Sequence, residues 1–397
     1  MFFRKKKPES LSDLTMHQGI FRSRITLFEG IALMLSGTIG AGVLGLPYAV
    51  AKSGVLIGAL YIIGIGMLMI GLNLMLGEVA VRTNGSFQLV GFAKKYLGKT
   101  GGAIMTVMMY GMLFGALVIY LIGEGVTLAA LFGGSAFHWS LIFFVFAALL
   151  VVFGIRTLKT AELLLTIGIL TVVLLITSFS VPHIDVVHLY TTNLAFLFLP
   201  YGVVLFSFHG TTAVPEMYSV LRHDNGTFKK AIIIGGLVVM ALYLLFSFVA
   251  VGVTGADTTQ IATIGLGNQL GRVMFLFGNA FAFFAMATSF LLNGVALKDS
   301  LSWDYKLPTS VAALIALGIP LTVVLLGLRQ FIEAINIVGG VFGSLEMLLV
   351  LLIYWRAKKM GDLDPGKYKL HHIALIGALL LLVLTVGAIY SVFVLFI

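Results

Sequence analysis

The chain has 397 residues, of which 60% are hydrophobic and only 10% are charged. An ordinary soluble domain carries about 25% charged residues, so this composition excludes a water-soluble globule. Apolar runs of about 20 residues, long enough to cross a bilayer as helix, recur to the end of the chain. The sequence therefore predicts an all-α polytopic membrane protein in contact with the lipid bilayer.

Charge and residue types exclude several classes of function. The formal net charge is +9, but the basic residues are scattered over short loops, so no nucleic-acid partner is expected. The chain has no cysteine, which excludes disulfides, iron–sulfur clusters and thiol catalysis. No HExxH, P-loop or Ser/His/Asp pattern is present, so neither an enzyme nor a cofactor is expected.

Eleven apolar segments are separated by polar breaks. Residues 1–25 precede them, and their basic, polar composition predicts a cytoplasmic N-terminal tail and no signal peptide. An odd number of spans places the two ends of the chain on opposite sides of the membrane. The spans are expected at residues 26–51, 55–81, 101–131, 139–155, 160–181, 193–218, 231–255, 267–297, 309–328, 331–355 and 371–396.

The basic residues give the expected orientation. Of the 25 Lys and Arg, all but Lys52, Arg272 and Arg329 fall in segments that this span count places on one side. Basic loops stay in the cytoplasm, so the N-terminus is expected there and the C-terminus outside. The sequence predicts an integral protein of the plasma (cytoplasmic) membrane and leaves its oligomeric state open.

The first span contains SGTIGAGVLGLP at residues 36–47, with four glycines at the depth of the membrane midplane. Non-helical backbone is tolerated there only where it is buried in protein or lines a cavity, and glycine favours it. A tight small-xxx-small helix contact is the alternative. Pro47 favours an unwound span, because it would fit the first turn of a half-helix that begins near Gly42.

The sixth span has the same kind of interruption, FSFHGTTAVPE at residues 206–216. Gly210 can end one half-helix, and Thr211 or Thr212 can cap the next. The Pro-Glu pair that follows suits the first turn of a helix. The sequence therefore predicts a second unwound segment at mid-depth.

The two interrupted spans lie five spans apart and run in opposite directions. This arrangement indicates an inverted repeat. Spans 1–5, at residues 26–181, form one half, and spans 6–10, at residues 193–355, form the other. Span 11, at residues 371–396, is an addition.

An unwound midplane segment offers free N–H groups, free carbonyls and the end of a half-helix dipole to one cavity. A zwitterion suits these groups, which predicts an amino acid substrate. Its carboxylate is expected at the N–H groups from Gly40 to Gly42, and its ammonium at carbonyls near Ser36 and between Phe206 and His209. A branched side chain at Gly40 or Gly42 is expected to abolish binding without unfolding the protein.

Side chains at a similar depth are candidate walls of this pocket. Aromatic residues make up 12% of the chain, so packing or lipid contact is the alternative for each of them. For His209, the alternative is an imidazole satisfied by backbone carbonyls. The full candidate set for substrate binding is Ser36, Thr38, Gly40, Ala41, Gly42, Tyr110, Phe206, Phe208, His209, Gly210, Phe284 and Asn336.

Three segments resemble those of known transporters: GTIGAGVLGLPYA in span 1, SFHGTTAVPEM and the following FKKAIIIG in span 6, and ATSFLLNGVALKD in span 8. They are similar to the amino acid/auxin permeases and the bacterial hydroxy and aromatic amino acid permeases. Both belong to the amino acid/polyamine/organocation superfamily. The resemblance covers nearly the whole chain and implies the LeuT fold, a 5+5 inverted repeat plus one helix with spans 1 and 6 unwound.

The resemblance also implies symport with Na⁺ or H⁺ by alternating access. In relatives with a sodium site, hydroxyls of span 8 bind the ion, and Thr288 and Ser289 match those positions. In some proton-coupled relatives a lysine near the start of span 5 takes that place, and Lys159 lies in the corresponding region. The residues leave the ion open, with protons favoured because helix hydroxyls commonly bond to carbonyls of their own helix.

Three of the acidic residues inside spans are further candidates, because charges there are costly and usually face the bundle interior. Glu78 is expected to pair with Arg82, four residues on. Glu124 is a candidate proton carrier, with an interhelical hydrogen bond as the alternative, and Glu346 is equally ambiguous.

The leading functional hypothesis is an ion-coupled amino acid symporter. The pocket candidates offer apolar area without a clear counter-charge, so a neutral, aromatic or medium-sized apolar substrate is expected. The alternative is a transporter-like nutrient receptor that binds an amino acid without transporting it.

Overall fold

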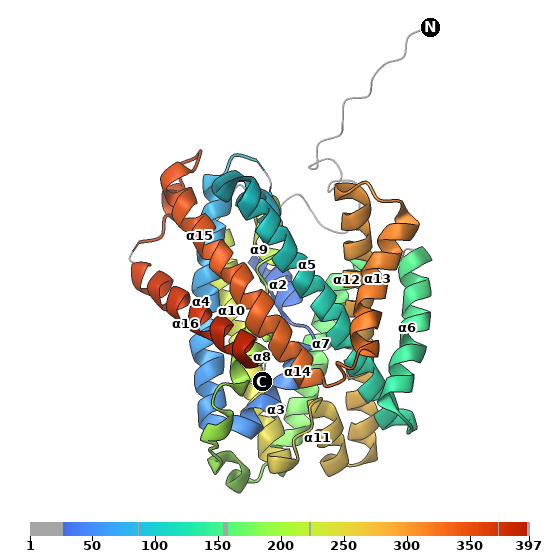
Figure 1. Cartoon of the computed structure of the whole chain (residues 1–397). Helices are drawn as coiled ribbons and strands as arrows, with labels where there is room; N and C mark the ends of the chain where they lie inside the picture. The colour runs from blue at the N-terminus through green and yellow to red at the C-terminus, as the bar shows by residue number, and fades with distance from the viewer. Residues whose placement is uncertain (1–26, 86, 154–157, 222–223, 372, 395–397) are drawn as a thin grey trace.

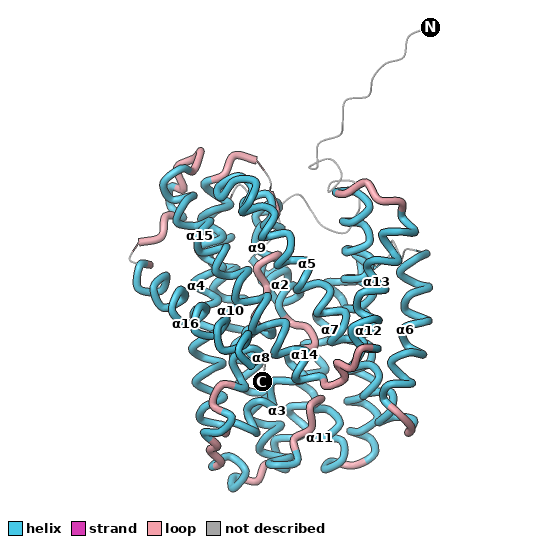
Figure 2. The backbone as a smooth tube through the Cα atoms, viewed as in Figure 1, coloured by secondary structure: helices cyan, strands magenta, loops and turns pink. Residues whose placement is uncertain are grey.

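The computed structural model describes residues 27–85, 87–153, 158–221, 224–371 and 373–394. Within these residues the chain consists of helices and loops, and Figure 2 shows no strand among them. The predicted tail lies outside the described residues. The expectation of an all-helical protein is confirmed for the described part of the chain.

The first half forms α2 (Leu27–Thr38), α3 (Gly42–Ser53), α4 (Val55–Arg82), α5 (Leu89–Phe132), α6 (Ala136–Phe153) and α7 (Leu158–Ser180). Inside α5, Gly98 has a φ of 77°, which glycine adopts without strain and which kinks the helix. Three single turns of 3-10 helix lead to the second half: Val181–His183, Val186–Tyr190 and Leu194–Phe196.

The second half has more and shorter elements. α14 and α15 are joined by a π-helical turn, Val338–Gly343. The carboxylate of Asp224 caps α10 by accepting a hydrogen bond from the N–H of Thr227 at 3.0 Å. The helices are α8 (Leu199–Ser207), α9 (Ala213–Leu221), α10 (Asn225–Thr254), α11 (Ala262–Leu270), α12 (Arg272–Asp304), α13 (Thr309–Leu325), α14 (Phe331–Ile337), α15 (Ser344–Met360) and α16 (Ala374–Val394).

Six helical segments of the described chain are long and apolar enough to cross a membrane, and the bent pair α2–α3 raises the number to seven. The six are α4, α5, α10, α12, the combined α14–α15 and α16. α6, α13 and the apolar part of α7 are shorter, and the predicted sixth span consists of the nine-residue helices α8 and α9. Every predicted span thus coincides with at least one helix, although only six or seven of these helical segments are by themselves long and apolar enough to cross a membrane.

Figure 1 shows α4, α15 and α16 on one flank of the bundle and α6, α12 and α13 on the other, with α2, α8 and α9 between them. α10 packs against α2, α3 and α4, whereas α5 packs against α6, α12 and α15. We call the side where α4 and α15 end the basic side. It carries Arg82, Lys95, Lys358 and Lys359.

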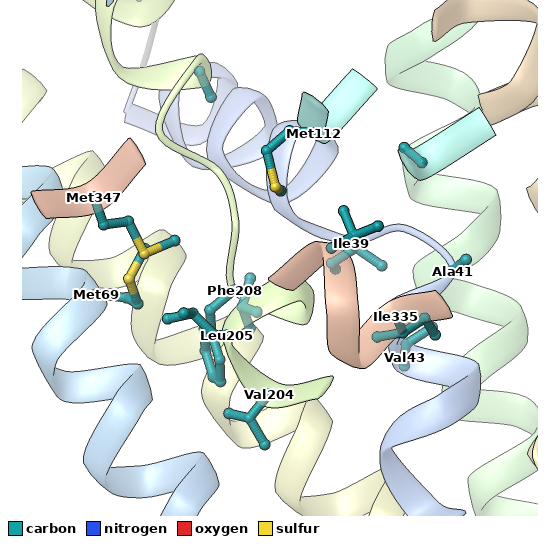
Figure 3. Close-up of a cluster of buried hydrophobic side chains, with 14 of the residues drawn as sticks. Ile39, Ala41, Val43, Met69, Met112, Val204, Leu205, Phe208, Ile335 and Met347 are labelled. Carbon is teal, nitrogen blue, oxygen red and sulfur yellow. The ribbon is translucent and has the colours of Figure 1, made fainter. Parts of the chain in front are cut away.

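Apolar side chains pack closely around the middle of the bundle. Figure 3 shows Met69 of α4 and Met347 of α15 pointing toward one another beside Phe208, at the end of α8. All three are buried. The ring of Phe208 also meets that of Tyr243 on α10 edge to face, with ring centroids 5.1 Å apart. This packing fixes the rotation of α15 about its own axis.

Candidate functional site

The first break separates α2 from α3, whose axes are bent by 63°. The chain is non-helical from Ile39 to Ala41. The N–H groups of Gly40, Ala41 and Gly42 have no hydrogen-bond partner among the described residues, because they precede the first intrahelical bond of α3. The span is thus interrupted at its glycines, although Pro47 lies in the second turn of α3 and not, as expected, in the first.

The second break comprises residues 208–212, between the end of α8 and the start of α9. The chain leaves α8 through a hydrogen bond from the N–H of His209 to the carbonyl of Phe206, at 3.1 Å. Glu216 lies in the first turn of α9, as predicted, where a carboxylate interacts favourably with the helix dipole. This span is interrupted at the predicted place as well.

The two breaks lie in the middle of the bundle, where Figure 2 draws them as loop. α3 packs against α8 and α2 packs against α9, so the two broken spans run antiparallel. Tyr243 of α10 joins the breaks, because its hydroxyl donates to the carbonyl of Ser207 at 2.8 Å and to that of Thr38 at 3.3 Å. A Cβ atom added at Gly42 would lie 2.8 Å from the Cα of Ser207.

A cavity of about 280 Å³ lies against both breaks. Small-molecule sites usually have a few hundred Å³, so this cavity suits a compact ligand. Its walls come from α2 and the first break, α5, α8 and the second break, α9, α12 and α15. The lining residues used below are Leu33, Ser36, Thr38, Gly40, Gly42, Met109, Tyr120, Phe206, His209, Thr212, Glu216, Ser289, Asn293 and Glu346.

The cavity extends from Tyr120 and Gly40, in the middle of the bundle, toward the basic side. Leu33, Met109 and Glu216 line that part, and Glu216 is exposed. On the opposite side of the first break, apolar side chains of α14 fill the space next to α3. The exposed rim of the cavity therefore lies toward the basic side.

One wall of the cavity is polar. The hydroxyl of Tyr120 on α5 is within hydrogen-bonding reach of Ser289 and Asn293 on α12, and all three residues line the cavity. A Cβ atom added at Gly40 would meet only the Tyr120 hydroxyl, at 3.5 Å. Hydroxyl and amide groups thus line the same cavity as Gly40 of the first break.

Glu346 of α15 faces the second break. Its Oε1 accepts hydrogen bonds from Nε2 of His209 at 2.9 Å and from the hydroxyl of Thr211 at 2.8 Å. Its Oε2 is buried and has no partner among the described residues. The side chain of Glu346 is 1% exposed and that of His209 is 16% exposed, so the imidazole is the accessible member of the pair. Glu346, which the sequence left ambiguous, thus lines the cavity.

The candidate substrate-binding residues divide into two groups. Those that line the cavity are Ser36, Thr38, Gly40, Gly42, Phe206 and His209. Those that are absent from its lining are Ala41, Tyr110, Phe208, Gly210, Phe284 and Asn336.

The residues of the second group have other surroundings. Tyr110 is hydrogen-bonded to Ser300 at 2.9 Å, nearer the basic side, and Phe284 is 64% exposed on α12. Asn336 packs against Gly202 of α8. Ala41, Phe208 and Gly210 are buried within the breaks themselves. Their depth was predictable from the sequence, but the direction of each side chain depends on helix rotation.

The ion-coupling candidates are dispersed. The hydroxyl of Thr288 donates to the carbonyls of Phe284 and Ala285 on its own helix, whereas Ser289 reaches the cavity. Lys159 lies in α7, and its side chain is outside the described residues. Neither carboxyl oxygen of Glu124 makes a hydrogen bond of ordinary geometry, and Glu124 does not line the cavity.

Glu78 forms the predicted ion pair with Arg82, at 2.7 Å. Its second carboxylate oxygen accepts from the N–H of Leu370 at 3.1 Å and from the hydroxyl of Tyr354 at 3.3 Å. The pair therefore ties α4 to α15 and to the segment before α16 on the basic side. The structural interpretation of Glu78 is confirmed.

Sequence reasoning missed the polar wall. Tyr120 and Asn293 are single polar side chains in otherwise apolar runs, and this was the only signal that could have found them. The pairing of His209 with Glu346 has no local signal, because the two residues are 137 positions apart.

Comparisons with known proteins add to these observations. The model of the tryptophan/tyrosine permease family matches residues 24–393. Glutamine transporter 2 of Aliivibrio fischeri is 25% identical in an alignment of 388 residues that covers 89% of this chain and 98% of that protein. Tyrosine-specific transport system 1 of Haemophilus influenzae is 25% identical in an alignment of 384 residues that covers 89% of this chain and 94% of that protein.

A solved structure is also similar. The crystal structure of the Eremococcus coleocola manganese transporter aligns with a TM-score of 0.61 and 14% sequence identity, over 97% of this chain and 88% of that chain. At this identity the likeness shows a shared transporter fold and nothing about the substrate.

Proposed function

The chain belongs to the tryptophan/tyrosine permease family, and from this premise we propose that it is a secondary active amino acid transporter, an ion-coupled symporter that works by alternating access. The observation that carries the proposal is the pair of antiparallel broken helices beside one cavity. Three consecutive N–H groups, from Gly40 to Gly42, lack hydrogen-bond partners there among the described residues. Such groups recognise a carboxylate through backbone alone.

The substrate lies along the first break in this proposal. Its carboxylate accepts hydrogen bonds from the N–H groups of Gly40 to Gly42, and its ammonium contacts the carbonyls at the end of α2. Its side chain extends toward Tyr120, Ser289 and Asn293. Glu216 lies at the exposed rim of the cavity, toward the basic side.

The substrate class is a neutral amino acid of medium or aromatic size. Glu346 is the acid nearest the breaks, and its Oε1 is already engaged by two donors. The Glu346 carboxylate therefore leaves little surface for a cationic side chain, and an anionic one would find no Lys or Arg among the described cavity residues. The relatives named for glutamine and tyrosine transport support this class.

The topology proposed is eleven spans in a LeuT-like arrangement, with residues 26–181 and 193–355 as inverted repeats and span 11 added. The antiparallel packing of the two broken spans supports it. The basic side is then cytoplasmic, with the N-terminus inside and the C-terminus outside a plasma membrane. The cavity opens to that side, so this conformation faces the cytoplasm.

Uptake into proteoliposomes tests the proposal. Labelled tyrosine, tryptophan and glutamine are each offered under an inward H⁺ gradient or an inward Na⁺ gradient. We expect one of them to accumulate above its external concentration under one gradient. When each of the twenty amino acids is added as a competitor of the labelled substrate, lysine, arginine, aspartate and glutamate should not inhibit its uptake. Binding without uptake under either gradient would instead identify a receptor.

A further inference from the structure

The second break carries a buried cluster that recognition of an amino acid backbone does not require. Oε1 of Glu346 accepts hydrogen bonds from His209 at 2.9 Å and from Thr211 at 2.8 Å, and both donors belong to the break. Oε2 is buried without a partner among the described residues. An ionised carboxylate with one unpaired oxygen is costly inside a membrane protein, and one bound proton removes that cost.

The geometry at Glu346 selects a proton over larger cations. Oε2 exposes less than 1 Å² of surface, so neither a substrate ammonium nor a sodium ion with its several oxygen ligands can contact it. The Thr211 hydroxyl is already used as a donor to Oε1. A proton needs no shell of ligands, and it can arrive through His209, whose side chain is 16% exposed next to the cavity.

Packing holds Glu346 in this orientation. The next residue, Met347, points at Met69 of α4 (Figure 3), and successive residues on a helix project about 100° apart. Glu346 is thereby turned toward the second break. It also lies in the first turn after the π-helical segment Val338–Gly343, a feature that is frequent at functional sites.

The other titratable groups of the surrounding elements are engaged or peripheral. The Tyr120 hydroxyl of α5 is within hydrogen-bonding reach of Ser289 and Asn293. Tyr243 of α10 donates to the carbonyls that end α2 and α8. Glu78 of α4 is paired with arginine, and Lys298 of α12 donates to a carbonyl of α6 at 2.8 Å. Glu216 of α9 is exposed at the cavity rim. Among the described side chains, the Glu346–His209 pair is the titratable group that lies both at a break and away from bulk water.

We propose that Glu346, with His209 and Thr211 as positioning residues, is the proton-binding site that couples amino acid transport to H⁺. This rests on the proposed function above. The carboxylate takes one proton from the outer solution when the cavity faces outward, and releases it to the cytoplasm when the cavity faces inward. Protonation weakens the hydrogen bonds that Oε1 accepts from the second break. Proton binding is thereby coupled to the conformation of the broken span that borders the substrate.

Glu346→Gln tests the proposal in proteoliposomes without sodium, under an acid-outside pH gradient. Glutamine keeps the size and the Oε1 acceptor but cannot bind the proton. Wild-type protein should accumulate substrate by about tenfold for each unit of pH gradient, if one proton moves per substrate. The variant should still exchange labelled for unlabelled substrate, but should fill the vesicles only to the external concentration.

Glu124→Gln is the matched control, because Glu124 is also a buried carboxyl inside a helix but does not line the cavity. It should accumulate substrate as the wild type does. Accumulation by Glu346→Gln at the wild-type level overturns the proposal, as does loss of accumulation in Glu124→Gln alone. Wild-type protein that neither exchanges nor accumulates any amino acid overturns the proposed function instead.

A second variant covers the case in which Glu346→Gln does not fold. Thr211→Val removes one donor to the carboxylate, which raises its affinity for a proton. The pH at which uptake is half-maximal should therefore shift upward, without loss of exchange. Thr127→Val is the control, because the buried Thr127 hydroxyl has no hydrogen-bond partner among the described residues. An unchanged pH profile in Thr211→Val overturns the proposal.

Discussion

The two breaks share a geometry but differ in chemistry. The first break, at residues 39–41, brings unpaired N–H groups to the cavity and carries no titratable side chain. The second, at residues 208–212, places His209 and Thr211 against a buried carboxylate on α15.

An interrupted helix can thus serve two purposes. At the first break, glycine and alanine let the backbone approach the ligand directly. Recognition there is insensitive to pH, because no side chain of the break titrates. At the second break, where the residues are histidine and threonine, the same unwound geometry aims side-chain donors at a neighbouring helix. Substitutions that act on one break only can therefore separate substrate binding from coupling.

The largest expected effect is that of Gly42→Val. A Cβ atom there would lie 2.8 Å from the backbone of Ser207, so the two breaks could not pack together. We expect a loss of about 1–3 kcal/mol of folding stability, the usual cost of overpacking. The measurement is the thermal unfolding midpoint and the yield of monodisperse protein. Gly64→Val is the control, because nothing lies within 4 Å of a Cβ atom at Gly64.

Gly40→Val should leave the fold intact and weaken substrate binding by more than about tenfold, or 1.4 kcal/mol. A Cβ atom at Gly40 meets only the Tyr120 hydroxyl, so the valine has room, but it fills the place of the carboxylate. Gly40→Ala should have a smaller effect. Unchanged affinity in Gly40→Val, measured by titration with substrate, would move the carboxylate site away from the first break.

Tyr243→Phe tests the link between the breaks. Removal of the hydroxyl leaves the carbonyls of Ser207 and Thr38 without their donor, at a cost of about 1 kcal/mol. We expect a lower unfolding midpoint and weaker binding together. In Tyr218→Phe, whose ring packs on Phe228, both should stay near wild type. A change in binding with no change in stability would mean that the Tyr243 hydroxyl contacts substrate.

The smallest expected effect is that of Thr288→Ala. The Thr288 hydroxyl bonds to carbonyls of its own helix and does not line the cavity, so stability should change by less than about 0.5 kcal/mol. Uptake should be the same with and without sodium in both proteins. A wild type that requires sodium, with the requirement abolished in Thr288→Ala, would contradict the assignment of coupling to the second break.

The sequence treats Gly40 and Gly42 alike, and the structure separates them. Both are midplane glycines in one motif, and both were expected to tolerate a side chain without unfolding. Both line the cavity, and only the packing of α3 on α8 shows that Gly42 also contacts Ser207. A glycine pattern indicates where the backbone approaches something closely, but not whether that is a ligand or another helix.

Local sequence patterns predicted the membrane class, a helix in each apolar segment and the two interruptions. These depend on local properties: runs of apolar residues, glycine and proline at mid-depth, and basic residues between spans. Which side chains reach the cavity depends on how the helices pack against one another. Phe284 and Glu346 are both predicted at mid-span, yet one is 64% exposed and the other lies against His209, 137 positions away. Helices apolar on nearly every face carry no local signal for their rotation, so neighbouring helices set it by packing.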